Sequence, residues 1–231
     1  MKRVLVIALV LAACGGEDPT GVIVSAASSL TDAFGELEAA YEAENPDIDI
    51  ILNLGGSAAL RDQILEGAPS DVFAPASLDM VRQVTSDDVR SFAHSQLYIA
   101  VPLGNPGGVT GLSDFGRSEL LVGLCVEPAP CGALARQALD MAGVAVSLDT
   151  SEPNARALLA KIEAGELDLG IVYVTDVLKN QVEGIALDHF ADYAIALVPE
   201  AVNPEAGQGF INFVLSEQGQ TILAEYGFLT E

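Results

Sequence analysis

The stretch SAASSLTDAF, residues 25–34, decides the fold, because in it a predicted strand runs straight into a predicted helix. The β-branched run VIV at residues 22–24 predicts a buried strand. Ser29 is a favourable N-cap, and Asp32 follows three residues later as the acid of a capping box. Backbone N–H groups and the positive end of a helix dipole meet at such a corner. The corner is therefore a candidate anion site, with a plain helix cap as the alternative.

Three further corners of the same type follow along the chain. The sequence GGS at residues 55–57 comes after the predicted strand 48–52, and its glycines allow the backbone to approach a ligand closely. The sequence PCG at 130–132 follows the predicted strand 120–126, and SEPNA at 151–155 opens another helix. Four such corners suggest a shared ligand. The alternative is that any α/β protein contains corners of this kind.

The overall charge restricts the possible partners. The 231 residues include 33 Asp and Glu against 10 Lys and Arg, which gives a formal net charge of −23. This negative field repels nucleic acid and anionic membrane surfaces, so we expect no nucleic-acid partner. Half of the residues are apolar, which predicts a globular chain of one large or two small domains. An anionic ligand would have to be held by short-range donors.

The N-terminus predicts export. Lys2 and Arg3 precede a short apolar run that ends in LAAC at residues 11–14, and this run is too short to span a bilayer. Small residues before a cysteine are typical of a bacterial lipoprotein signal. We therefore expect residues 1–13 to be a signal peptide and residues 14–20 to be a tether lipidated at Cys14, at the periplasmic or extracellular face. An ordinary secretory signal is the alternative.

The other two cysteines form an even pair in a chain predicted to be exported. Cys125 and Cys131 flank the five-residue loop VEPAP. An oxidising compartment favours a disulfide over two free thiols. A metal site is a poor alternative, because two thiols are too few ligands and neither histidine is near in sequence.

The strand and helix pattern predicts an α/β fold with largely parallel sheets. The predicted strands are Val22–Ser25, Ile48–Leu52, Val72–Ala74, Leu97–Val101, Leu120–Val126, Leu169–Tyr173 and Ala194–Val198. Two of them, 97–101 and 194–198, end at a proline and are candidates for crossovers between two lobes. Residues 21–96 with 200–231 would then form lobe 1, and 97–199 would form lobe 2. The four corners would meet in a cleft between the lobes.

At this point the sequence resembles a known family, the periplasmic molybdate-binding proteins of ABC transporters. The resemblance covers nearly the whole chain after the tether. It is carried by AASSLTDAF (26–34), GGSAALRDQI (55–64), EGAPSDVFA (66–74), PCGALA (130–135), NARALL (154–159), LGIVY (169–173) and QGQTILAEYGF (218–228). The resemblance implies the two-lobed periplasmic-binding-protein fold, each lobe a mostly parallel sheet flanked by helices, with the ligand cleft between the lobes.

The resemblance also implies a ligand and a site. Ser29 and Ser57 would contact the oxyanion by hydroxyl and amide, Cys131 and Ala155 by backbone N–H, and Tyr173 by its phenolic O–H. Cys131 stands where a small residue such as Ala is usual, which matters little if only its amide is used. We expect a monomer that binds molybdate or tungstate, uses no cofactor or resident metal, and delivers the ligand to a membrane permease.

The chemistry of these five groups supports that reading, because all of them are donors. Molybdate, tungstate and sulfate are fully deprotonated near neutral pH, whereas phosphate keeps a proton and needs an acceptor. Two alternatives remain open. One is a binding protein for sulfate, an organic anion or an Fe(III)–anion complex. The other is an enzyme on the same fold with Ser57 or Cys131 as nucleophile, although no His or Lys stands beside either in sequence.

Overall fold

The computed structural model describes residues 20–178 and 180–230, and in it a mixed sheet of eight strands runs through the molecule. The order of the strands across the sheet is β2-β1-β3-β8-β4-β7-β5-β6. The strands are β1 (Thr20–Ala27), β2 (Ile48–Gly55), β3 (Val72–Ala74), β4 (Arg90–Pro102), β5 (Val122–Cys125), β6 (Thr150–Glu152), β7 (Leu169–Tyr173) and β8 (Val182–Leu197).

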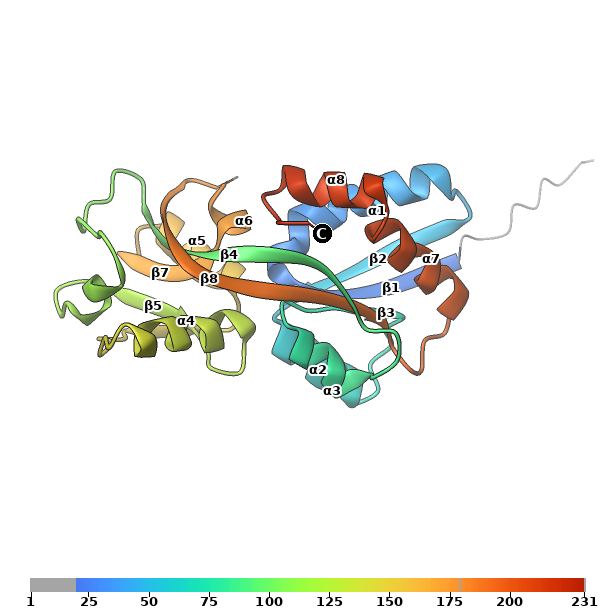
Figure 1. The fold of residues 1–231 in the computed structure, drawn as a ribbon, viewed down its shortest axis with the longest axis horizontal. Coiled ribbons are helices and arrows are strands. Elements are labelled where there is room, and N and C mark those ends of the chain that lie inside the picture. The colour runs from blue at the N-terminus through green and yellow to red at the C-terminus, as the bar shows by residue number, and fades with distance from the viewer. Residues whose placement is uncertain (1–19, 179, 231) are drawn as a thin grey trace, which may run out of the picture.

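Helices cover both faces of this sheet. The α-helices are α1 (Thr31–Glu44), α2 (Ser57–Leu65), α3 (Leu78–Val84), α4 (Pro130–Met141), α5 (Ala155–Glu163), α6 (Val174–Val177), α7 (Pro204–Val214) and α8 (Glu217–Glu225). The 3₁₀ turns are η1 (Ser28–Leu30) and η2 (Leu112–Gly116). Helices α1, α7 and α8 lie on one side of β1 and β2, and α2 and α3 lie on the other (Figure 1).

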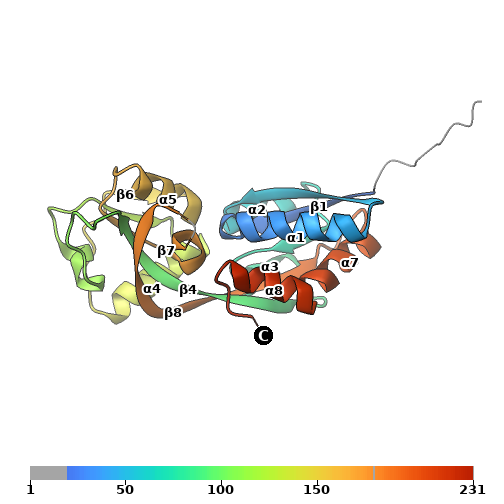
Figure 2. The same cartoon turned by 90° about the horizontal axis from the view of Figure 1, so that it is seen from above.

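The two halves of the molecule are joined by β4 and β8, which run across both (Figures 1 and 2). Within each half the pairing is parallel: β1 with β2 and β3, and β5 with β6 and β7. The two long strands are antiparallel to each other and to their outer neighbours β3 and β7. The predicted α/β architecture is confirmed. The lobe boundaries remain predictions.

Several strands differ from their predicted bounds. The strands 72–74 and 169–173 lie where the sequence places them. The predicted crossover strands are longer, since β4 begins at Arg90 and β8 at Val182. Their added parts alternate buried and exposed side chains, and a search for continuous apolar runs misses such half-buried strands. The polar strand β6 was missed for the same reason.

The predicted cap of the first helix is wrong. Ser29 lies inside η1, the N-cap of α1 is Leu30, and no side chain caps that helix. Instead, the Ser29 hydroxyl is hydrogen-bonded to the phenol of Tyr193 at 2.8 Å. A buried tertiary partner has therefore replaced the local capping interaction that the sequence favours.

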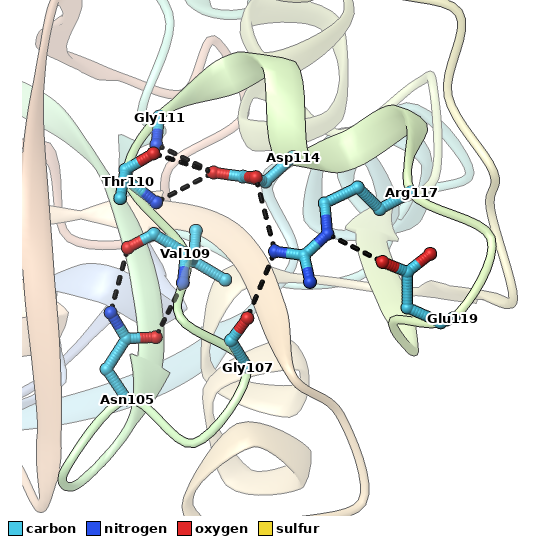
Figure 3. A network of polar contacts seen from close by, with 8 residues as sticks. All are labelled: Asn105, Gly107, Val109, Thr110, Gly111, Asp114, Arg117 and Glu119. Carbon is cyan, nitrogen blue, oxygen red and sulfur yellow. Dashed lines mark hydrogen bonds and ion pairs between the residues drawn. The ribbon is translucent and has the colours of Figure 1, made fainter.

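The segment between β4 and β5 forms a hydrogen-bonded loop (Figure 3). One oxygen of the Asp114 carboxylate accepts bonds from the Thr110 N–H at 2.7 Å, the Gly111 N–H at 3.1 Å and the Thr110 hydroxyl at 3.2 Å. Arg117 pairs with the other oxygen at 3.4 Å and donates to the Gly107 carbonyl. These bonds, led by that of Thr110, hold the pKa of Asp114 below its usual range.

The predicted signal peptide, residues 1–13, the lipidation site Cys14 and almost all of the tether lie outside the described residues. Among the residues that the structure describes, no helix is both long and apolar enough to cross a membrane.

Candidate functional site

The four predicted corners meet at one small cavity between the two halves of the molecule. All five predicted site residues line it: Ser29, Ser57, Cys131, Ala155 and Tyr173. The cavity volume is about 10 Å³, against roughly 300–1,000 Å³ for pockets that take drug-sized ligands. In this conformation the site therefore has no room for an organic metabolite, and even a small ion would have to move its walls slightly.

Each corner sits at the carboxyl end of a strand, where α/β sheets bind their ligands. Ser29 follows β1 in η1, and Ser57 is the first residue of α2, after β2. Cys131 and Ala155 lie in the first turns of α4 and α5, which follow β5 and β6. Tyr173 is the last residue of β7. The parallel pairing in each half thus brings two corners to the same edge of the sheet, joined by Tyr173 in the half that contains β5.

Tyr173 brings a buried donor to the cavity. Its side chain is 2% exposed, and within the described chain its hydroxyl has no hydrogen-bond partner. Burial, and then the nearby Asp176 carboxylate, raise the pKa of this phenol well above its ordinary value, so the hydroxyl keeps its proton. A buried donor without an acceptor is costly, and the cavity is the place from which an acceptor can come.

In both serines that line the cavity, the hydroxyl oxygen already has a hydrogen-bond partner within the protein. The Ser57 Oγ accepts a bond from the Ala76 N–H at 3.2 Å, and the Ser29 Oγ is 2.8 Å from the Tyr193 Oη. A serine whose oxygen accepts a protein donor has its own hydrogen left to give. At Ser57 that hydrogen is available to a bound anion.

Cys131 and Ala155 contribute helix N-termini. The first N–H groups of a helix lack partners within the helix, and the dipole places partial positive charge there. In α5 the side chain of Asn154 accepts from the Ala157 N–H at 2.9 Å, and Ala155, the first residue of this helix, lines the cavity. A Cβ on Gly132 would lie 2.0 Å from the Val126 carbonyl oxygen, so the start of α4 packs directly on the preceding loop.

Cys125 and Cys131 are bonded as a disulfide, with their Cα atoms 5.8 Å apart. The bond ties the end of β5 to the first turn of α4. Arg136 donates to the Cys125 carbonyl at 2.8 Å and to the Gly132 carbonyl at 3.0 Å, which fixes the same corner from the opposite side of the turn. The backbone that presents the Cys131 N–H is thus restrained twice.

Charged groups surround the cavity but do not line it. None of its lining residues is Lys or Arg. Arg156 on α5 pairs with Asp32 on α1 at 2.7 Å and so joins the two halves beside the site. The carboxylate of Asp176 is fully buried, its Oδ2 accepts from the Tyr173 N–H at 3.2 Å, and its Oδ1 has no partner in the described chain. Burial raises the pKa of Asp176 to about 6.

The described residues include no group of three or more His, Cys, Asp or Glu that could hold a metal ion. What the site offers is a set of neutral N–H and O–H donors around a small closed space, which a small ion could enter after a slight movement of its walls. Such an arrangement can hold an anion by preorganised dipoles, without a countercharge and without a reacting group.

Sequence reasoning missed two residues behind the site, Tyr193 and Asp176. Tyr193 stands one residue before the predicted strand 194–198, so it was not read as part of a buried strand. Asp176 follows Tyr173 by three residues in the spacing of a capping box, a signal that could have been found.

Comparisons with known proteins identify the family of the chain. The sequence profile of the bacterial extracellular solute-binding proteins matches residues 22–229. The molybdate-binding protein ModA of Mycobacterium tuberculosis is 29% identical over 240 residues, which covers 94% of this chain and 92% of that protein.

Among solved structures, the sulfate-binding protein SubI of Mycobacterium tuberculosis has a TM-score of 0.78 at 18% identity, covering 90% of this chain and 86% of that one. The periplasmic molybdate-binding protein of Azotobacter vinelandii has a TM-score of 0.75 at 14% identity, covering 91% and 99%. At these identities the two structures show a shared fold. Because the profile spans almost the whole described chain, the chain belongs to the bacterial extracellular solute-binding proteins.

Proposed function

We propose that this protein binds molybdate and tungstate in the cavity between its halves and delivers the anion to the permease of an ABC transporter. The buried hydroxyl of Tyr173, which has no partner in the described chain, carries the proposal. An oxyanion in the cavity would supply the acceptor that this hydroxyl lacks. The proposal also draws on the similarity to ModA, which binds molybdate.

The donor set favours a fully deprotonated anion. The ligand would receive hydrogen bonds from the hydroxyls of Ser29, Ser57 and Tyr173 and from the N–H groups of Cys131 and Ala155, all of which line the cavity. Hydrogen phosphate would bring a donor of its own into a site built from donors. We therefore expect phosphate to bind far more weakly than molybdate.

Sulfate is the second candidate. It has the charge and the lack of protons that the donor set requires, and a sulfate-binding protein shares this fold. Sulfate is smaller than molybdate, so the two differ in how well they fill the same ring of donors. A catalytic role is less well supported, because the Cys131 sulfur is bonded to Cys125 and is not a free thiol.

The remaining parts of the proposal concern the whole chain. Lobe 1 (21–96 and 200–231) and lobe 2 (97–199) would open and close about β4 and β8, which gives a ligand access to so small a cavity. The LAAC sequence supports a lipid anchor at Cys14 that holds the protein, as a monomer, at the periplasmic or extracellular face.

Calorimetric titration of the purified protein with molybdate, tungstate, sulfate and phosphate tests the function. We expect tight binding of the first two at one site per chain, much weaker binding of sulfate, and almost no heat from phosphate. Preferential sulfate binding would select the second candidate. Phosphate binding as tight as that of molybdate would contradict the donor-only site.

A further inference from the structure

Tyr193 stands behind the cavity and touches two of its walls. It lies on β8 and is fully buried. Its hydroxyl is 2.8 Å from the Ser29 Oγ, a residue 164 positions away in the sequence. Its ring meets the ring of Tyr173 nearly edge-on, with the centroids 5.9 Å apart. Tyr193 itself does not line the cavity.

The surroundings of Tyr193 decide the direction of its hydrogen bond. Apart from Tyr173, its ring packs against Phe92 at 6.1 Å and Phe228 at 5.2 Å between centroids. In residues 20–178 and 180–230 the Ser29 Oγ is the one hydrogen-bond partner of the Tyr193 hydroxyl. Burial raises the pKa of Tyr193 well above its ordinary value, so the hydrogen stays on its oxygen.

If Ser29 were the donor in this pair, the Tyr193 hydrogen would be buried among aromatic rings with no acceptor. That arrangement leaves a desolvated donor unpaired, whereas donation from Tyr193 to Ser29 satisfies it. The Ser29 oxygen is then the acceptor, and its own hydrogen is left for the cavity. Ser57 is held in the same way by the Ala76 N–H.

We propose that Tyr193 is a specificity-determining positioning residue, which fixes the Ser29 hydroxyl as a donor and so selects fully deprotonated oxyanions over protonated ones. The proposal rests on the oxyanion-binding function proposed above and deepens it. Without the Tyr193 hydroxyl, Ser29 could turn its hydrogen away and accept one from hydrogen phosphate. The discrimination against phosphate would then weaken even though no group lining the cavity has changed.

The test compares Tyr193→Phe with wild type by calorimetric titration with molybdate at pH 8, without and with a high concentration of inorganic phosphate as competitor. The quantity measured is the dissociation constant of phosphate, obtained from this competition, divided by that of molybdate. We expect the variant to lower this ratio at least about tenfold, a typical effect of one hydrogen bond on discrimination. In a Ser29→Ala background the same change should leave the ratio unaltered, because the oxygen that Tyr193 controls is gone.

The matched control is Tyr226→Phe, which removes a phenolic hydroxyl bonded to Glu36 on the protein surface. It should leave the ratio at the wild-type value. A Tyr193→Phe variant that weakens both ligands equally would overturn the proposal and show a merely structural role. Wild-type protein that binds no oxyanion would instead overturn the proposed function itself.

A second measurement needs no variant and covers the case in which Tyr193→Phe does not fold. The buried hydroxyl proton of Tyr193 should exchange slowly enough for NMR detection and should show a through-space contact to the Ser29 β-protons. A Ser29 hydroxyl proton directed at the Tyr193 oxygen would overturn the proposal.

Discussion

Two regions of the half that contains β5 each hold a buried aspartate, and the two carboxylates differ in hydrogen bonding and in the direction of their pKa shift. In the loop after β4, Asp114 accepts three hydrogen bonds and an ion pair, and its pKa is lowered (Figure 3). Beside the cavity, Asp176 has one oxygen without a partner in the described chain, and burial raises its pKa to about 6. The neighbouring Tyr173 hydroxyl also has no hydrogen-bond partner among residues 20–178 and 180–230.

The difference separates a structural network from a binding site. In the loop, the Asp114 carboxylate is hydrogen-bonded to groups of the same loop, so no ligand is needed to complete its bonding. At the cavity the Tyr173 hydroxyl is a donor left open at a cost in stability, and natural proteins accept that cost where a ligand completes the bonding. Asp176 stands behind this lining, and its carboxylate is an acceptor that an anion does not satisfy. We therefore expect changes in the two regions to affect different measurements.

The largest expected effect comes from removing the cavity hydroxyls together, in a Ser29→Ala, Ser57→Ala and Tyr173→Phe triple variant. Each hydroxyl should contribute roughly 1.5–3 kcal/mol to binding, as a hydrogen bond to a charged group does. The triple variant should bind no molybdate measurable by calorimetry. Ser29→Ala and Ser57→Ala also remove the acceptors of the buried Tyr193 hydroxyl and Ala76 N–H, so each should cost roughly 1–3 kcal/mol of stability, and thermal unfolding must show that the triple variant is folded.

The control for the triple variant removes two hydroxyls away from the cavity, by Ser86→Ala and Tyr98→Phe. These changes should leave the affinity for molybdate at its wild-type value. If the triple variant bound molybdate as tightly as wild type, the ligand would lie elsewhere in the molecule.

The second effect is a pH dependence of stability from Asp176. Its folded pKa of about 6 lies above the ordinary value of 3.8, so the folded state holds this proton more tightly than the unfolded chain. The free energy of unfolding should therefore fall as the pH rises from about 4 to about 6, by an amount on the order of 3 kcal/mol. Asp176→Asn should remove this fall.

Urea unfolding at several pH values measures the effect, with Asp140→Asn on the surface of α4 as the matched control. Parallel pH profiles for wild type and Asp176→Asn would refute the assignment of this pH dependence to Asp176.

The third effect concerns the disulfide. A Cys125→Ala, Cys131→Ala double variant should lose roughly 2–3 kcal/mol of stability, the value for closing so short a loop. The Cys131 N–H remains, but its corner is less restrained, so the affinity for molybdate should fall a few-fold. Mass spectrometry of unreduced protein provides the direct check. Two free thiols after folding under oxidising conditions would show that the bond is not part of the native protein.

The smallest effect is expected in the hydrogen-bonded loop that contains Asp114. Asp114→Ala should cost roughly 1.5–2 kcal/mol of stability through the lost charged hydrogen bonds. Because the folded pKa of Asp114 is lowered, its contribution is present above about pH 4 and is lost as the pH falls further. Thermal unfolding measures this change, and calorimetry should show unchanged molybdate binding. A large loss of affinity would mean that the loop and the cavity are coupled.

The sequence predicts the strand-to-helix corners of this fold better than the buried residues that pack behind the corners, such as Tyr193. The corners depend on local signals, such as glycines, serines and helix starts after apolar strands. The five site residues at these strand ends were chosen from the family resemblance, and all five line the same cavity. Tyr193 could not be found in this way, because its bond to Ser29 joins residues 164 positions apart. The same non-local bond explains why the predicted cap at Ser29 is wrong.

The central claim is that the cavity holds its ligand by neutral donors of the four corners, and co-crystallisation with tungstate tests it most directly. Tungsten scatters X-rays anomalously, so its position can be located without assumptions about the site. We predict one strong anomalous peak per chain, with its oxygens within hydrogen-bond distance of Ser29, Ser57 and Tyr173. A peak held by Lys or Arg elsewhere, or an empty cavity at saturating tungstate, would contradict the account.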